Sequence, residues 1–314
     1  MTGILAGMND LPIGIFDSGL GGLTVAAEVM RALPHESVLY VGDTARWPYG
    51  PRPQAEVREF VLQIGAWIAR NDVKMLVIAC NTGTAAGLEV AQRTFDVPVI
   101  GVVEPGARAA VKATRNRRVG VIATSGTVES GAYSGAVRAL DAGVTVFSVA
   151  APKLVDIVEQ GLRMGPGTLE EWVAESSEVY VRPSFYEIAR DYLAPLKGTE
   201  VDTLVLGCTH FPLLAPAIGQ VMGRRVRIVS SAEETAHEVA ETLEARRQLA
   251  PDGNISRHRF VTTGDAEEFA RLGSRVLRRR IAKAEHIDVG ELTSGKIPPQ
   301  RPLEGNGASG TEGT

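Results

Sequence analysis

Short, continuous apolar runs alternate with segments of helical periodicity along most of this chain. We expect strands at residues 13–16, 37–42, 74–79, 97–102, 118–123, 145–150, 203–207 and 226–230. Their apolarity continues without in/out alternation, which is typical of strands covered by helices on both faces. Helical patterns lie between them, for example over residues 23–33, 54–72 and 232–249. This β–α–β–α order predicts an α/β fold of mostly parallel sheets flanked by helices, and so many strands favour two sheets.

A weak internal symmetry divides the chain into two similar halves. Each half has a small-residue loop after its first strand, "DSGLGG" in one and "TSGT" in the other. Each also ends a later strand with a cysteine, in "ACNT" and "GCTH". Ligands of open parallel sheets bind beyond the C-terminal ends of the strands. The sequence therefore predicts two similar domains with an active-site cleft between them.

The composition excludes several classes of partner. The formal charge is −4, from 33 basic and 37 acidic residues, so we expect no nucleic acid and no membrane surface as partner. No apolar run reaches the roughly 18 residues that a membrane helix needs, and the N-terminal residues do not resemble a signal peptide. Two cysteines make no disulfide framework, which favours a reducing, cytoplasmic location.

Metal and nucleotide motifs are missing from the sequence. Cys80 and Cys208 form no CxxC pair, and the five histidines have no ligand spacing. "GLGGLT" begins a GxG but has Thr24 where the dinucleotide fingerprint needs a third glycine. We expect the glycines of this loop to permit a tight turn between strand and helix.

Cys80 and Cys208 each have two interpretations. A lone free cysteine is commonly a small buried apolar residue. Both, however, stand at strand ends before expected helices, where free N–H groups and the helix dipole favour a thiolate. Two such thiols facing one cleft suit proton exchange at a carbon, which needs a base on one face and an acid on the other.

Six motifs carry a family resemblance. They are "IFDSGLGGLTV", "VGDTARWPYGPR", "ACNTGTAA", "GVVEPGARAA", "GVIATSGT" and "LVLGCTHFPLL". In this order they resemble the glutamate racemases of the cofactor-independent aspartate/glutamate racemase family. The resemblance implies interconversion of L- and D-glutamate without a cofactor, supply of D-glutamate for peptidoglycan, and a homodimer. A racemase for aspartate or another acidic amino acid and a related one-cysteine decarboxylase are alternatives, and so is an additional gyrase-inhibiting role.

The resemblance also implies roles for individual residues. Cys80 and Cys208 would be the catalytic acid/base pair, with Asp17 assisting Cys80, and His210 with Glu159 assisting Cys208. The substrate would be held by Asp17, Ser18, Tyr49, Gly50, Asn81, Thr82, Thr127, Thr209 and His210.

Plainer interpretations of four of these positions stay open. Asp17 and Ser18 also suit a cap after the first strand, and His210 suits a helix cap. Glu159 is also typical of a solvated helix surface, and Tyr49 of packing within a proline-rich loop.

The expected domain boundaries follow from the same resemblance. The first domain would comprise residues 1–105 plus 226–285, and the second residues 106–225. Composition predicts a surface insertion near 162–180 and a disordered tail over 286–314, because neither segment carries a regular apolar pattern.

Overall fold

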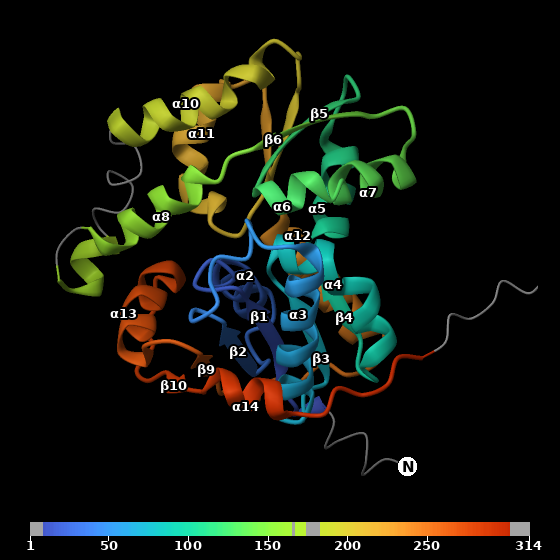
Figure 1. Cartoon of the computed structure of the whole chain (residues 1–314), viewed down its shortest axis with the longest axis vertical. Helices are drawn as coiled ribbons and strands as arrows, with labels where there is room; N and C mark the ends of the chain where they lie inside the picture. The colour runs from blue at the N-terminus through green and yellow to red at the C-terminus, as the bar shows by residue number, and fades with distance from the viewer. Residues whose placement is uncertain (1–8, 165–166, 174–182, 302–314) are drawn as a thin grey trace, which may run out of the picture.

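The protein folds around two parallel β-sheets that lie one above the other in Figure 1. The structure, a computed structural model, describes residues 9–164, 167–173 and 183–301. The first sheet has six strands in the order β10 (Glu285–His286), β9 (Arg259–Thr262), β2 (Val38–Gly42), β1 (Ile13–Asp17), β3 (Met75–Ile78) and β4 (Val99–Gly101). The second has four strands in the order β6 (Thr145–Ala150), β5 (Arg118–Ala123), β7 (Thr203–Gly207) and β8 (Arg227–Ser230).

Both sheets are parallel throughout their described pairs, which confirms the predicted fold class. The strands β1, β2, β3 and β7 are buried along their whole length. This burial explains their continuous apolar sequences, since helices cover both faces of each sheet.

The helices alternate with the strands along the chain. Around the first sheet lie α2 (Leu23–Ala32), α3 (Gln54–Ala69), α4 (Asn81–Thr94), α13 (Ala266–Leu277) and α14 (Val289–Ser294). Around the second lie α5 (Val103–Ala113), α6 (Ser125–Glu129), α7 (Ala132–Leu140), α8 (Lys153–Arg163), α10 (Pro183–Lys197), the 3₁₀ turn η1 (Phe211–Leu214) and α11 (Ala215–Met222). Helix α12 (Ser231–Ala245) contacts both α2 and α5 and thereby joins the two halves.

Each sheet has one point at which its strand order reverses. In the first sheet β2 and β3 lie on opposite sides of β1, and in the second β6 and β7 lie on opposite sides of β5. The crevice beyond the strand ends at such a switch point is the usual ligand site of an open parallel sheet. Cys80 follows β3 and Cys208 follows β7, so each thiol stands at the switch point of its own sheet.

Two expected boundaries differ from the structure. Strand β8 pairs with β7, so residues 227–230 belong to the second sheet and not to the first domain as predicted. The chain returns to the first sheet only after β8, by way of α12. Residues 286–301 of the expected tail are described as structure: α14 begins after Asp288, and Leu292 is fully buried in the first domain. Residues 302–314 lie outside the described residues.

The expected surface insertion is partly a core element. Leu162, the second-last residue of α8, has a buried side chain, and Trp172 is almost fully buried in the same apolar cluster. A side chain as large as tryptophan stabilises a domain through the apolar area that it buries. The composition missed this contribution because one aromatic residue produces no periodic pattern. Residues 165–166 and 174–182 lie outside the described residues.

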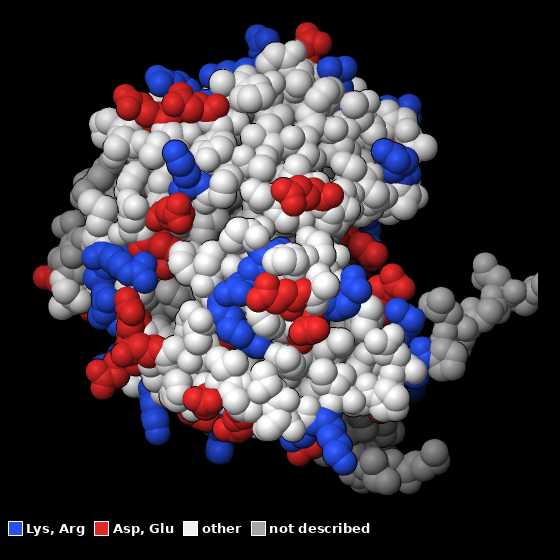
Figure 2. Space-filling view, viewed as in Figure 1, with Lys and Arg blue, Asp and Glu red and all other residues white. Residues whose placement is uncertain are grey.

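Charges of both signs are interspersed on the face shown in Figure 2. None of the helices described here has the length and apolarity needed to cross a membrane.

Candidate active site

A cavity of about 240 Å³ lies between the C-terminal edges of the two sheets. Both cysteines line it, from loops that belong to different sheets. The predicted residues at its wall are Ser18, Tyr49, Gly50, Cys80, Asn81, Thr82, Cys208, Thr209 and His210. The fold therefore brings together residues separated by most of the chain, as the cleft prediction requires.

Cys80 is the N-cap of α4. Its Sγ accepts a hydrogen bond from the Gly83 backbone N–H at 3.3 Å and lies 3.8 Å from Ser18 Oγ. The thiol is only 6% exposed. Burial, followed by the nearby Asp17 carboxylate, raises the pKa of Cys80 well above its ordinary value, although the Gly83 and Ser18 hydrogen bonds oppose this. Cys80 thus holds its proton at neutral pH, and its thiolate is a strong base once formed.

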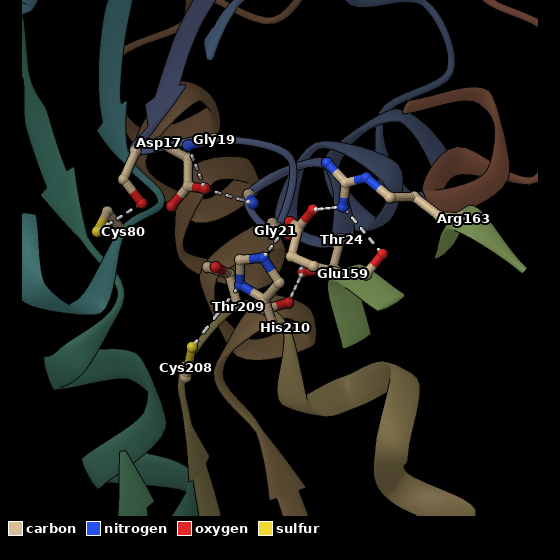
Figure 3. Close-up of polar contacts among 12 residues, drawn as sticks. Asp17, Gly19, Gly21, Thr24, Cys80, Glu159, Arg163, Cys208, Thr209 and His210 are labelled. Carbon is tan, nitrogen blue, oxygen red and sulfur yellow. Dashed lines mark hydrogen bonds and ion pairs between the residues drawn. The ribbon is translucent and has the colours of Figure 1, made fainter. Parts of the chain in front are cut away.

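Cys208 has different support. Its Sγ lies 3.9 Å from His210 Nδ1, and His210 Nε2 lies 3.0 Å from Glu159 Oε1 on α8 (Figure 3). Burial of the imidazole opposes its protonation, but the hydrogen bonds to Cys208 and Glu159 outweigh burial and raise the pKa of His210 well above its ordinary value. Burial likewise opposes ionisation of Glu159, yet the contacts with His210 and Arg163 lower its pKa. The arrangement places an imidazole that favours its protonated form between Cys208 Sγ and a carboxylate.

The two thiols are therefore not equivalent. Cys80 begins an α-helix of 14 residues, whereas the chain after Cys208 enters a four-residue 3₁₀ turn. The sequence predicted a helix N-terminus at both cysteines, which is wrong for Cys208. At Cys208 the His210 side chain takes the place that the Gly83 backbone N–H group has at Cys80, as the group that contacts the sulfur.

Asp17 lies behind the cavity wall. One carboxylate oxygen, Oδ2, accepts hydrogen bonds from the backbone N–H groups of Gly19 at 3.1 Å and Gly22 at 3.0 Å. The other, Oδ1, is buried and has no hydrogen-bond partner among the described residues. Asp17 thus organises the loop after β1, as the capping alternative proposed, and also acts electrostatically on Cys80. Ser18, its neighbour, does line the cavity.

The glycines of this loop serve close packing. Gly21 and Gly22 do not have positive φ, but a Cβ on Gly22 would lie 2.4 Å from the Cβ of Asp17 in the same loop, so the absence of a side chain permits the tight turn between β1 and α2. A Cβ on Gly21 would lie 2.4 Å from Thr209 Oγ1 and 2.5 Å from His210 Nδ1. The backbone of the first domain therefore presses directly against the Cys208 loop of the second. Thr24 adds a hydrogen bond from its hydroxyl to the Thr209 carbonyl at 3.0 Å.

We expect Gly21→Ala to destabilise the protein by about 1–3 kcal/mol, because the added methyl overpacks this contact. It should also lower turnover by displacing the His210 ring. Urea unfolding and steady-state kinetics measure the two effects. Gly135→Ala is the matched control: no atom lies within 4 Å of its would-be Cβ, and it stands inside helix α7, so it should be neutral or stabilising. Equal stability of the two variants would contradict the packing argument.

Three threonine hydroxyls form a triangle across the cleft. Thr82 Oγ1 lies 2.9 Å from Thr124 Oγ1 and 3.3 Å from Thr127 Oγ1, and Thr124 and Thr127 are 3.0 Å apart. Thr82 belongs to the first domain and the other two to the second. Thr82 and Thr124 line the cavity, whereas the predicted Thr127 lies behind them.

Asn81 presents an amide group to the cavity. Its Oδ1 accepts a hydrogen bond from the Tyr133 hydroxyl at 2.7 Å, which fixes the orientation of the amide. Its Nδ2 is buried, and no residue in the described part of the chain forms a hydrogen bond with it. An unsatisfied buried donor is costly, so this N–H group is suited to bind an anionic group in the cavity.

The Tyr49 loop closes the cavity opposite the second sheet. The Tyr49 hydroxyl donates to Asp43 Oδ2, and its ring packs against Phe60 with centroids 5.3 Å apart. The ring therefore lines the cavity while the hydroxyl supports the loop, as the packing alternative proposed. The Gly126 N–H donates to the Gly50 carbonyl at 3.0 Å and joins the two domains at this edge.

Sequence reasoning missed several wall residues. They are Pro48, Pro51, Thr124, Ser125, Pro152, Val155 and Asp156. Thr124 and Ser125 stand in the loop "TSGT" that the sequence singled out, and their position directly after β5 was an available signal. Val155 and Asp156 come from helix α8, whose approach to the cavity depends on tertiary packing. Within residues 9–164, 167–173 and 183–301, no group of three or more His, Cys, Asp or Glu is arranged to hold a metal ion.

These features define a two-domain α/β protein with one thiol on each wall of its cleft. Residues 23–239 match the model of the Asp/Glu/hydantoin racemase family. The chain is 47% identical over 278 residues to glutamate racemase of Corynebacterium diphtheriae, covering 88% of this chain and 98% of that protein. It is therefore a member of the Asp/Glu/hydantoin racemase family.

Solved structures agree with this assignment. Glutamate racemase RacE1 of Bacillus anthracis superposes with a TM-score of 0.79 at 41% identity, covering 89% of this chain and 98% of that one. Glutamate racemase of Francisella tularensis, solved in complex with D-glutamate, superposes with a TM-score of 0.78 at 28% identity, covering 91% and 99% of the two chains.

Proposed function

We propose that this chain interconverts L- and D-glutamate by proton exchange between two cysteines. The observation that carries the proposal is that Cys80 and Cys208 line one cavity from the switch points of two different sheets. Relatives that span nearly the whole chain are glutamate racemases, and one was solved with D-glutamate. A base and an acid on opposite faces of one carbon are what inversion by proton exchange needs.

The proposed reaction moves one proton on each face of the α-carbon. The thiolate on one wall takes the α-proton and becomes a thiol, which leaves an electron pair on the substrate. The thiol on the other wall then gives its proton to the opposite face and becomes a thiolate. The two walls exchange roles for the other enantiomer. In the resting protein Cys80 holds its proton, because burial and Asp17 disfavour its thiolate.

The carbanionic transition state needs stabilisation of the negative charge that spreads onto the α-carboxylate. Preorganised hydrogen-bond donors in a water-poor cavity provide this. The free amide N–H of Asn81 and the hydroxyls of Ser18, Thr82 and Thr209 have the right chemistry and line the cavity. Thr124 and Ser125 join this set in place of Thr127 as wall residues. His210 is assigned to Cys208 first and to the substrate second, because Glu159 and Cys208 engage both of its nitrogens.

The cellular role follows from the reaction. D-Glutamate made in this way would supply peptidoglycan synthesis, and a catalyst with two reduced thiols suits the cytoplasm. We further propose a homodimer, which light scattering of the purified protein tests directly.

The test of the reaction class is incubation of the purified, cofactor-free protein with L-glutamate and, separately, with L-aspartate. We expect circular dichroism to report loss of optical activity with L-glutamate and a much slower loss with L-aspartate. Faster racemisation of aspartate would replace the proposed substrate with the shorter acid. No change with either acid would overturn the proposed function.

A further inference from the structure

Arg163 is the last residue of helix α8 and lies near Cys208 and His210. It does not line the cavity. Its Nη1 donates to Glu159 Oε2 at 2.8 Å and to the Glu159 backbone carbonyl at 3.0 Å. His210 holds the other oxygen of the same carboxylate, Oε1, at 3.0 Å. In Figure 3 the Glu159 carboxylate lies between the Arg163 guanidinium and the His210 ring. Arg163 and His210 thus each bind a different oxygen of the Glu159 carboxylate.

The helix geometry favours this arrangement. Glutamate and arginine four residues apart lie on the same face of a helix, and the order with glutamate first is the favourable one. A cation in the last turn also interacts well with the helix dipole. One guanidinium nitrogen that bridges the carbonyl and the carboxylate of Glu159 limits rotation of that side chain. Glu159 is therefore held toward His210 and away from solvent.

Other charged groups lie close to Arg163 and Glu159. On helix α13, Glu268 lies 3.5 Å from Arg163 Nε. Asp265 lines the neighbouring cavity together with Arg163 and Glu159, and Asp156 of α8 lines the main cavity. Glu268 and Asp265 thus add negative charge close to Arg163, and Asp156 adds it to the main cavity. Arg163 adds to the effect of His210 in keeping Glu159 ionised.

We infer that Arg163 is a positioning residue of the reaction. It holds Glu159 ionised and oriented, so that Glu159 stabilises the imidazolium of His210 beside Cys208. This inference rests on the proposed function for its kinetic consequence, but the contact with His210 has a readout of its own. The Arg163 side chain is 49% exposed, so solvent screens its charge and the expected effect is moderate.

The test is Arg163→Gln, which removes the charge and keeps a polar side chain. We expect kcat/KM at neutral pH to fall about two- to fivefold, as for an exposed charged pair. The loss should grow toward acid pH, because the pKa of Glu159 rises when the lowering contribution of Arg163 is lost. The acid-side midpoint of the pH profile therefore moves upward. Arg163→Lys keeps the positive charge but not the planar guanidinium. Its acid-side midpoint should lie close to that of the wild type.

The readout independent of activity is the ¹⁵N NMR signal of the His210 ring during an acid titration. This signal changes when Glu159 is protonated. The midpoint pH of that change should be higher in Arg163→Gln than in the wild type and should return toward the wild-type value in Arg163→Lys. Arg31→Gln is the matched control, because Arg31 forms a similar exposed pair with Glu28 on α2. If the NMR midpoint shifts as expected but the wild-type protein has no racemase activity, the proposed function is overturned and the role of Arg163 toward His210 stands. An unchanged acid-side midpoint in both measurements would overturn the role of Arg163.

Discussion

Replacing Cys80 or Cys208 by alanine is expected to reduce racemisation of glutamate by at least about 10²–10⁴-fold, the usual contribution of one positioned acid or base. Each variant keeps the thiol on the other wall. That remaining cysteine, as its thiolate, can still take the α-proton of one enantiomer and, after exchange with solvent, return a solvent-derived proton to the same face. We therefore expect each variant to exchange the α-proton of one enantiomer without inverting it, as measured by ¹H NMR in D₂O.

The two alanine variants control each other. Cys80→Ala and Cys208→Ala should exchange opposite enantiomers, because their remaining thiols face opposite sides of the α-carbon. Both cysteines are only 6% exposed, so thermal unfolding must first establish that each variant is folded. Substantial racemisation by either folded variant, or exchange of the same enantiomer by both, would contradict the assignment.

The second large effect is expected for His210→Gln. The variant keeps a polar side chain but loses the cation beside Cys208 and the partner of Glu159. We expect kcat/KM at neutral pH to fall about 100-fold, within the range for loss of an acid/base group. The wild-type pH profile should also lose activity as the pH rises through the raised pKa of His210, and this limb should be missing in the variant.

The pH dependence of the free energy of unfolding provides an independent measure of the charge on His210. The pKa of His210 is raised above its ordinary 6.5 in the folded protein, so the folded state binds the proton more tightly than the unfolded chain does. The resulting stabilisation is complete below about pH 6.5 and is lost as the pH rises through the folded pKa. The urea midpoint of the wild type should therefore fall over that range more steeply than that of His210→Gln. His237→Gln, at an exposed position on α12, should follow the wild type; equal pH slopes for all three would contradict the raised pKa.

The strands were predictable where burial on both faces demands apolar residues. Each of the eight expected runs overlaps one strand of the structure, from β1 to β8. Strands β9 and β10 were missed for a physical reason. Strand β9 (Arg259–Thr262) has an exposed arginine at its start, and β10 (Glu285–His286) is two exposed residues long. Only β10 is an edge strand; β9 lies between β10 and β2, but its apolar run is limited to Phe260 and Val261, which is too short to predict a strand.

The site was predictable where the chemistry follows directly from a strand end. Cys80, Asn81, Thr82, Cys208, Thr209 and His210 could be placed at the cleft because parallel strands bring their C-terminal ends to one edge. Glu159 was the least secure prediction, since its sequence resembles an ordinary helix surface. Only the packing of α8 against the Cys208 loop brings its carboxylate to 3.0 Å from His210. Thr127 was implied by the family resemblance alone, and the sequence does not reveal that Thr124, directly before α6, lines the cavity instead.

The most direct test of the two-thiol account is early turnover of L-glutamate by the wild-type protein in D₂O. The proton taken by one thiol stays on that wall, while the other thiol supplies a solvent-derived deuteron. The account therefore predicts that newly formed D-glutamate carries deuterium at Cα while the remaining L-glutamate is still undeuterated. D-Glutamate that keeps the original α-proton, or equal early deuteration of both enantiomers, would contradict it.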